Sequence, residues 1–180
     1  MKRLAPFSTE RLVALPLRAE DLQELRRMHE DPAVMKFVGG VRTEEETERW
    51  LQDNLQHWNF HGFGLWTFRH ITHGAFVGRC GLRRVQLDSS DEVELGYSLV
   101  PQYWGKGLAT EMVKAVLAIG FEDIGLQSVI ALVYAANTKS RSVAERMCFH
   151  FERKTLWKGS QAMVYRLKRG QWTNTATNVF

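Results

Sequence analysis

The 180-residue chain predicts one α+β domain, spanning residues 1–180, in which helices are interleaved with a mixed sheet. Apolar residues recur at helical spacing in four segments, and seven others show the alternation or the short apolar runs typical of strands. No break in composition divides the chain. With 44% hydrophobic and 24% charged residues, its composition is that of a globular domain that buries its own core.

The first half of the chain predicts four strands and two helices. Thr43 and Glu46 fit a capping box, in which a hydroxyl and a carboxylate each accept a hydrogen bond from an amide at a helix start. In the last strand of this half, apolar residues alternate with Glu94, Gly96 and Ser98. The strands are expected at residues 11–17, 65–68, 75–77 and 93–100, and the helices at 22–28 and 44–62.

The second half predicts a helix, a buried strand, another helix and a closing hairpin. These elements are expected at residues 107–120, 128–134, 138–147, and 149–156 with 162–167. From about residue 171 to residue 180 the chain is polar, and we expect a flexible tail there.

Composition favours a cytoplasmic protein that holds an anionic small molecule. The net charge is +4 and the basic residues are scattered, so the sequence does not predict a nucleic-acid partner. Cys80 and Cys148 have neither the spacing nor the histidine neighbours of a metal site, so we expect no metal. No stretch of about 18 apolar residues occurs, so the sequence predicts no membrane span.

A glycine-containing loop at Pro101 to Ala109 joins a predicted strand to a predicted helix. Gly105 and Gly107 let backbone amides at the helix start point toward an anion, which predicts a phosphate site. A P-loop would need glycine at position 100, which is Val100. A dinucleotide fingerprint would need Gly or Ala at position 110, which is Thr110.

Two motifs resemble those of the GNAT acetyltransferases. The first is Gln102-x-x-Gly105-x-Gly107-x-Ala109, and the second runs from Asn137 to Phe149, beginning 35 residues after Gln102. The opening segment, residues 10–22, resembles the subgroup that includes ribosomal-protein N-terminal (alanine) acetyltransferases. The resemblance implies the GNAT fold, with a central mixed, mostly antiparallel twisted sheet of about seven strands and helices on both faces.

The resemblance also implies acetyl-coenzyme A as co-substrate and assigns residues to it. The loop amides would bind the pyrophosphate, Gln102 would shape the turn, and the end of the preceding strand would offer backbone partners to the pantetheine arm. Asn137 and Ser140 would contact the arm or its sulfur, although helix capping alone explains both residues. The implied cofactor-binding residues are Leu99, Val100, Gln102, Gly105, Lys106, Gly107, Leu108, Ala109, Thr110, Asn137 and Ser140.

Catalysis by such an enzyme needs a base for the amine and a proton for the thiolate. Glu94, on the strand that leads into the loop, is the candidate base, and Glu92 is its rival. Many relatives carry a tyrosine as general acid where this chain has Ala144. Ser140, Tyr134 and solvent are the alternatives that the sequence leaves open.

The implied function is transfer of an acetyl group from acetyl-CoA to a primary amine, either a protein N-terminus or a small molecule, by direct attack in a ternary complex. The alternative is an idle acyl-CoA-binding or ribosome-associated module. The acidic run Glu44, Glu45, Glu46 and Glu48 either recruits a cationic amine or interacts with the helix dipole. A monomer and a homodimer are both compatible with the sequence.

Overall fold

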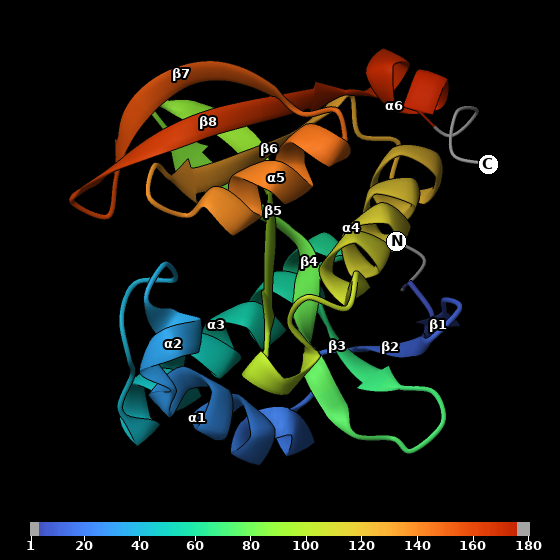
Figure 1. Cartoon of the computed structure of the whole chain (residues 1–180), viewed down its shortest axis with the longest axis vertical. Helices are drawn as coiled ribbons and strands as arrows, with labels where there is room; N and C mark the ends of the chain where they lie inside the picture. Colours follow the sequence, from blue (N-terminus) through green and yellow to red (C-terminus); the bar gives the residue numbers. More distant parts are fainter. Residues whose placement is uncertain (1–3, 176–180) are drawn as a thin grey trace.

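The computed structural model describes residues 4–175 (Figure 1). Its strands are β1 (Phe7–Ser8), β2 (Leu12–Pro16), β3 (Leu65–His70), β4 (Phe76–Leu87), β5 (Ser90–Leu99), β6 (Ser128–Tyr134), β7 (His150–Trp157) and β8 (Ser160–Lys168). Its α-helices are α1 (Leu22–Glu30), α2 (Pro32–Met35), α3 (Glu44–His61), α4 (Leu108–Ala118), α5 (Thr138–Arg146) and α6 (Arg169–Thr175). Short turns of other helix types precede α1, precede α4 and follow α4 at Ala19–Asp21, Pro101–Tyr103 and Ile119–Asp123.

The strands form one mixed sheet in the order β1-β2-β3-β4-β5-β6-β8-β7. Every neighbouring pair is antiparallel except β5 with β6, which is parallel. The prediction of a mostly antiparallel mixed sheet is confirmed. The sheet has eight strands where about seven were expected, because the two-residue strand β1 is too short to give a sequence pattern.

The capping box predicted for α3 is present. The Thr43 hydroxyl accepts a hydrogen bond from the Glu46 amide at 3.2 Å, and the Glu46 carboxylate accepts one from the Thr43 amide at 2.8 Å. Gly62 ends the helix in the left-handed conformation, with φ of 73°. These local signals therefore fix both ends of the longest helix.

Strand β4 differs most from its prediction, because it runs to Leu87 where residues 75–77 were expected. Its first seven residues are buried, so both faces of the sheet are covered there. Arg79 on one face lies over the Trp50 ring of α3, whereas Leu82 on the other face lies against Gly120, just after α4. A buried strand that contains arginine and glycine carries no apolar alternation, which is why the sequence did not reveal it.

The expected flexible tail also differs from the structure in its first residues. Helix α6 occupies Arg169–Thr175, and the Trp172 ring packs against Phe121 with ring centroids 5.9 Å apart. Trp172 is buried, so this part of the tail belongs to the core. Residues 176–180 lie outside the described part of the chain.

The parallel contact between β5 and β6 is limited to one register pair, Glu94 with Ile130. The two strands separate beyond this pair, on the side where β5 leads into the loop before α4. In Figure 1, α5 and the β7–β8 hairpin lie on one side of this opening, and α2 with α3 on the other. The fold thus places an interruption in the sheet beside the glycine loop.

Candidate functional site

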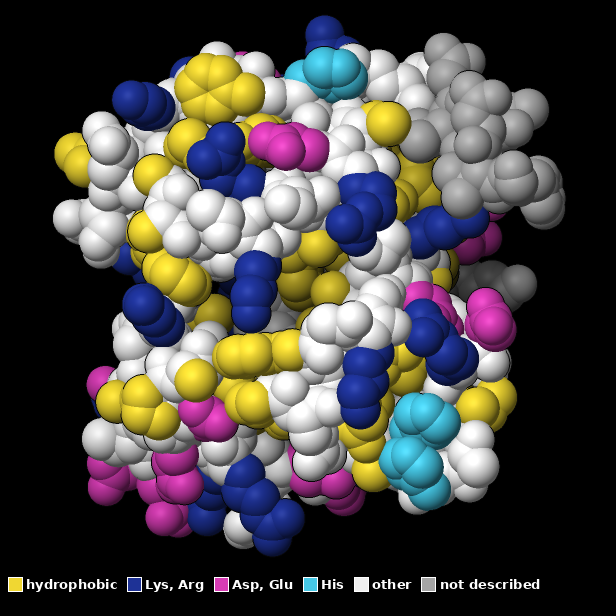
Figure 2. All heavy atoms as spheres, in the orientation of Figure 1, with side chains coloured by type: hydrophobic (Ala, Val, Ile, Leu, Met, Phe, Trp, Pro, Cys, Tyr) yellow, Lys and Arg dark blue, Asp and Glu magenta, His cyan; other side chains and the backbone are white. Residues whose placement is uncertain are grey.

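A cavity of about 900 Å³ fills the opening between β5 and β6. Its walls are residues 94–99 of β5, residues 131–134 of β6, the first turn of α4 and the first two turns of α5, and it extends to α2 and the segment before α3. Figure 2 shows a furrow across the middle of this face, with hydrophobic side chains in its floor and Lys and Arg side chains along its rim.

The glycine loop forms one wall of the cavity. Gly105 and Gly107 have φ of 73° and 76°, a region that side chains with a Cβ rarely adopt. Gly107 caps α4, so the amides of Leu108, Ala109 and Thr110 have no acceptor within the helix. Three such amides at the positive end of a helix dipole form an anion site.

Arg11 holds the loop against the N-terminal strands. Its guanidinium donates to the Lys106 carbonyl at 2.9 Å and forms an ion pair with Glu111 of α4 at 2.7 Å. Glu111 also accepts a hydrogen bond from the Arg11 amide at 2.8 Å. The loop is therefore fixed from outside the cavity, and its amides on the cavity side stay free.

Most of the predicted cofactor residues line this cavity. They are Leu99, Gly105, Gly107, Leu108, Ala109, Thr110, Asn137 and Ser140. Gln102 and Lys106 are exposed and lie outside the lining. The Lys106 ammonium lies 5.6 Å from the Tyr103 ring centroid.

Val100, also predicted to bind the cofactor, is not among the residues that line the cavity. Its amide donates to the Val77 carbonyl at 3.0 Å, and its carbonyl accepts a hydrogen bond from the Tyr103 amide at 3.0 Å. Both backbone groups are therefore engaged within the protein. Leu99 keeps its place in the lining, although its carbonyl accepts a hydrogen bond from the Trp104 indole at 2.8 Å.

Asn137 and Ser140 begin α5 on the opposite wall. The Asn137 side chain accepts a hydrogen bond from the Ser140 amide at 3.2 Å, so the capping role is present, and both residues also line the cavity. The Tyr97 hydroxyl of β5 donates to the Ser140 hydroxyl at 3.2 Å across the cleft. Burial raises the pKa of Tyr97 to about 12, so the phenol keeps its proton.

The two candidate bases have different surroundings. Glu94 is buried, lines the cavity, and accepts a hydrogen bond from Arg83 at 2.9 Å. Glu92 lies outside the lining and accepts two hydrogen bonds from Arg166, at 2.9 and 2.7 Å. Only the first of these carboxylates is thus placed beside the cavity.

Several cations that the sequence did not single out as site residues also line the cavity. Arg79 and Arg83 come from β4, Arg42 from the segment before α3, and Lys158 from the turn between β7 and β8. Glu94 is the single carboxylate that lines the cavity in the described part of the chain. The positions of the two arginines of β4 follow from strand pairing, since Arg83 lies opposite Glu94 and Arg79 opposite Ser98.

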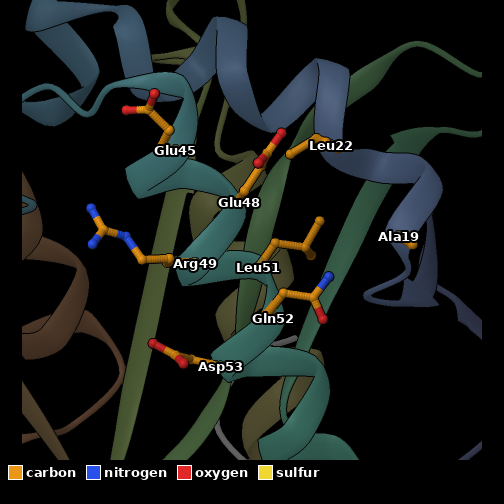
Figure 3. A pocket seen from close by; sticks show the side chains of 8 residues that line it. All are labelled: Ala19, Leu22, Glu45, Glu48, Arg49, Leu51, Gln52 and Asp53. Atoms are coloured by element: carbon orange, nitrogen blue, oxygen red, sulfur yellow. The ribbon is translucent and has the colours of Figure 1, made fainter.

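The acidic run at the start of α3 lies elsewhere. Glu45 and Glu48 line a separate pocket of about 550 Å³ on the outer side of α3, together with Arg49 and Asp53 (Figure 3). This pocket shares no lining residue with the cleft. Glu44 and Glu48 form ion pairs with Arg26 of α1. Two members of the run therefore tether α1 to α3, whereas Glu46 caps α3 and its charge acts on Arg42 of the cleft.

Comparison with known proteins identifies the family. The model of the acetyltransferase (GNAT) domain matches residues 11–150. The chain is 31% identical over 139 residues to the uncharacterized protein YkkB of Bacillus subtilis, covering 77% of this chain and 80% of that one. It is 32% identical over 154 residues to FsC-acetyl coenzyme A-N(2)-transacetylase of Aspergillus fumigatus, covering 79% of this chain and 64% of the relative.

A solved structure agrees with these matches. The acetyltransferase from Agrobacterium tumefaciens superposes with a TM-score of 0.81 at 27% identity, covering 93% of this chain and 96% of that one. The chain belongs to the GNAT acetyltransferase family and is an acetyl-CoA-dependent acyltransferase, as the two sequence motifs predicted. Among residues 4–175, no helix is both long and apolar enough to cross a membrane.

We predict that Gly107→Val weakens acetyl-CoA binding by at least about 100-fold, because a side chain at positive φ distorts the loop and crowds the amides that bind phosphate. Isothermal titration measures this change. The matched control is Gly74→Val in the β3–β4 turn, where φ is 69° and no heavy atom lies within 4 Å of an added Cβ. Equal affinity in the two variants would remove the loop from the donor site.

Proposed function

We propose that the cleft between β5 and β6 binds acetyl-CoA and presents its acetyl group to a primary amine, which is acetylated by direct attack in a ternary complex. One observation carries this proposal. The amides of Leu108, Ala109 and Thr110 have no acceptor within α4, and these residues line a cavity between two separated strands. The amides suit a pyrophosphate, and the free inner edges of two strands suit an extended amide-containing arm.

Cations at the cleft support the same assignment. Arg146 of α5 donates to the Thr110 hydroxyl at 2.9 Å, so its charge lies beside the first turn of α4. Lys139 lies 5.2 Å from the ring centroid of Trp104, next to the loop. An arm that carries phosphates therefore meets positive charge from α5 as well as from the N-terminus of α4.

The bound donor supplies a thioester whose carbonyl carbon an amine can attack. The new C–N bond forms as the C–S bond breaks, the amine loses a proton, and the thiolate leaves with the electron pair. In the proposed arrangement the Glu94 carboxylate takes the amine proton. Its burial and its place on the cavity wall support this role, and the bond from Arg83 holds the carboxylate in one orientation.

Ala144 has no hydroxyl to offer the leaving thiolate, and we assign this role to the hydroxyl of Tyr97 on β5. A simple thiol has a pKa of about 8.5. Full proton transfer from a phenol whose pKa is about 12 would therefore be unfavourable. We assign Tyr97, together with Ser140, the role of hydrogen-bond donors that stabilise the charge developing on sulfur, with solvent delivering the proton afterwards.

Replacing Glu94 tests the assignment of the base. Glu94→Gln should lower kcat by about 100-fold, the usual contribution of a general base, and leave the affinity for acetyl-CoA unchanged. A thiol-release assay measures kcat. Glu92→Gln is the control, because Glu92 pairs with Arg166 outside the cavity, and this variant should keep its activity. The assignment fails if Glu94→Gln keeps the wild-type rate and pH profile.

Replacing Tyr97 tests the second role. Tyr97→Phe removes one hydrogen-bond donor and should lower kcat by about 10- to 100-fold while KM for the acceptor stays within about twofold. Phe151→Tyr on exposed β7 adds a hydroxyl far from the cleft and serves as the control. A wild-type kcat for Tyr97→Phe would leave solvent or Ser140 alone as the partner of the thiolate.

The idle-module alternative makes a separate prediction for the same assay. It expects acetyl-CoA to bind without any acceptor-stimulated release of thiol. Release with at least one amine excludes it.

A further inference from the structure

The part of the cavity around Glu94 carries an excess of positive charge. Glu94 lies five residues before the end of β5, about 17 Å along the strand from Leu99. Arg42, Arg79, Arg83 and Lys158 line the cavity with it, so four cations face one carboxylate. Arg83 forms the ion pair with that carboxylate, so the same carboxylate offsets only part of the charge of Arg79 and Lys158.

Arg79 is the most informative of these residues. It is 4% exposed, and its Nε has no hydrogen-bond partner among residues 4–175. Its guanidinium stacks on Trp50 at 4.6 Å from the ring centroid. Burial, followed by the charges of Arg83 and Arg42, lowers the pKa of Arg79 to about 9. A buried cation without an anionic partner is unfavourable, and a ligand that brings a negative charge would relieve it.

The side chains packed behind these arginines are aromatic or neutral, and Glu46 of α3 offsets part of the positive charge of Arg42. Trp50 lies under both guanidinium groups, with Arg42 at 5.8 Å from its ring centroid. His29 packs edge-on against Trp50 and shares a hydrogen bond of 3.2 Å with Thr47. Burial, Arg79 and Arg42 lower the pKa of His29 to about 3, so the ring is neutral. Among the described residues, the carboxylate that offsets the charge of Arg79 is therefore Glu94 at the cavity wall, and not a group behind the arginines.

The floor of the cavity is open between Glu94 and Ser98, the residue that lies opposite Arg79. Gly96 lies between Glu94 and Ser98 on the same face of β5, and no heavy atom lies within 4 Å of the position that its Cβ would occupy. A compact molecule can therefore lie over Gly96, with one end at Glu94 and the other at Arg79. The acidic pocket on the outer side of α3 offers no comparable access to the cleft.

We propose, on the basis of the proposed function, that the acceptor is a small amine that also carries an oxyanion: its amino group binds at Glu94, and its oxyanion at Arg79 and Arg42. Planar guanidinium groups match the oxygens of carboxylates and phosphates by paired hydrogen bonds. Both groups share this chemistry, and the choice between them is left to the acceptors tested. Polyamines and other purely cationic amines are disfavoured by like charge.

Matched acceptor pairs test the inference with the wild-type protein. The pairs are β-alanine with β-alaninamide and phosphoethanolamine with ethanolamine, and spermidine represents cationic amines. We expect kcat/KM of at least one anionic member to exceed that of its uncharged counterpart by about 10- to 100-fold, the effect of one charge-assisted hydrogen bond. The pair with the larger ratio identifies the carboxylate or the phosphate.

Two outcomes count against the account in different ways. Transfer to spermidine or to the uncharged amines at rates equal to or above the anionic ones overturns the inference and leaves the acetyltransferase function intact. Binding of acetyl-CoA without transfer to any amine overturns the proposed function as well.

Variants locate the site. Arg79→Met should lower kcat/KM for the anionic acceptor by about 10- to 100-fold, with little change for the uncharged one and unchanged affinity for acetyl-CoA. Arg42→Gln, nearer the surface, should act in the same direction. Arg84→Met is the control, because Arg84 is exposed on the same strand and lies outside the cavity.

Thermal stability separates this role from a structural one. Because Arg79 is buried, forms no ion pair with a described residue and has an Nε without a hydrogen-bond partner among them, Arg79→Met should not lower the Tm of the acceptor-free protein. A lower Tm together with an equal loss of rate for charged and uncharged acceptors would show that Arg79 only supports the fold, and would overturn the proposal.

Discussion

The separation of β5 from β6 is the constraint on which the site depends. The two strands share the single register pair of Glu94 and Ile130, whereas each pairs along its length with its other neighbour, β4 or β8. A sheet that is continuous on both sides and open at one junction keeps its rigidity and still exposes two strand edges. The cavity, the glycine loop and the start of α5 all meet at this junction.

Two parts of the cleft, the glycine loop and the side that faces α3, attract negative charge by different means. At the loop, the free amides of the first turn of α4 do so, held in place by the contacts of Arg11 with Lys106 and Glu111. On the side that faces α3, guanidinium groups do so, and the buried one, Arg79, lies opposite Ser98. This division leaves the middle of the cleft, near Gly96 and Tyr97, to the reacting groups of donor and acceptor in the proposed function.

The features that the sequence revealed are those with local causes. The capping box at Thr43 and the glycines of the loop each act within a few residues, and the structure contains both. The family motifs likewise led to the correct fold.

What the sequence missed depends on contacts between distant segments. In the sequence Tyr97 is one of the apolar residues that alternate with Glu94, Gly96 and Ser98, and its hydrogen-bond partner Ser140 is 43 residues away. Arg79 and Arg83 interrupt the apolar pattern of β4, so the sequence did not predict the full strand. That both arginines line the cavity depends on the pairing of strands and could not be predicted either. Positions at which local rules fail inside a buried element are therefore candidates for function.

The most direct measurement of the central claim is an amide NMR titration of the full chain with acetyl-CoA. If the cleft between β5 and β6 binds acetyl-CoA, the largest chemical-shift changes fall on the amides of residues 105–110, on the end of β5 and on the start of α5. The assignment of this cleft is contradicted if saturating acetyl-CoA leaves these amide shifts unchanged and instead changes those around the pocket on the outer side of α3.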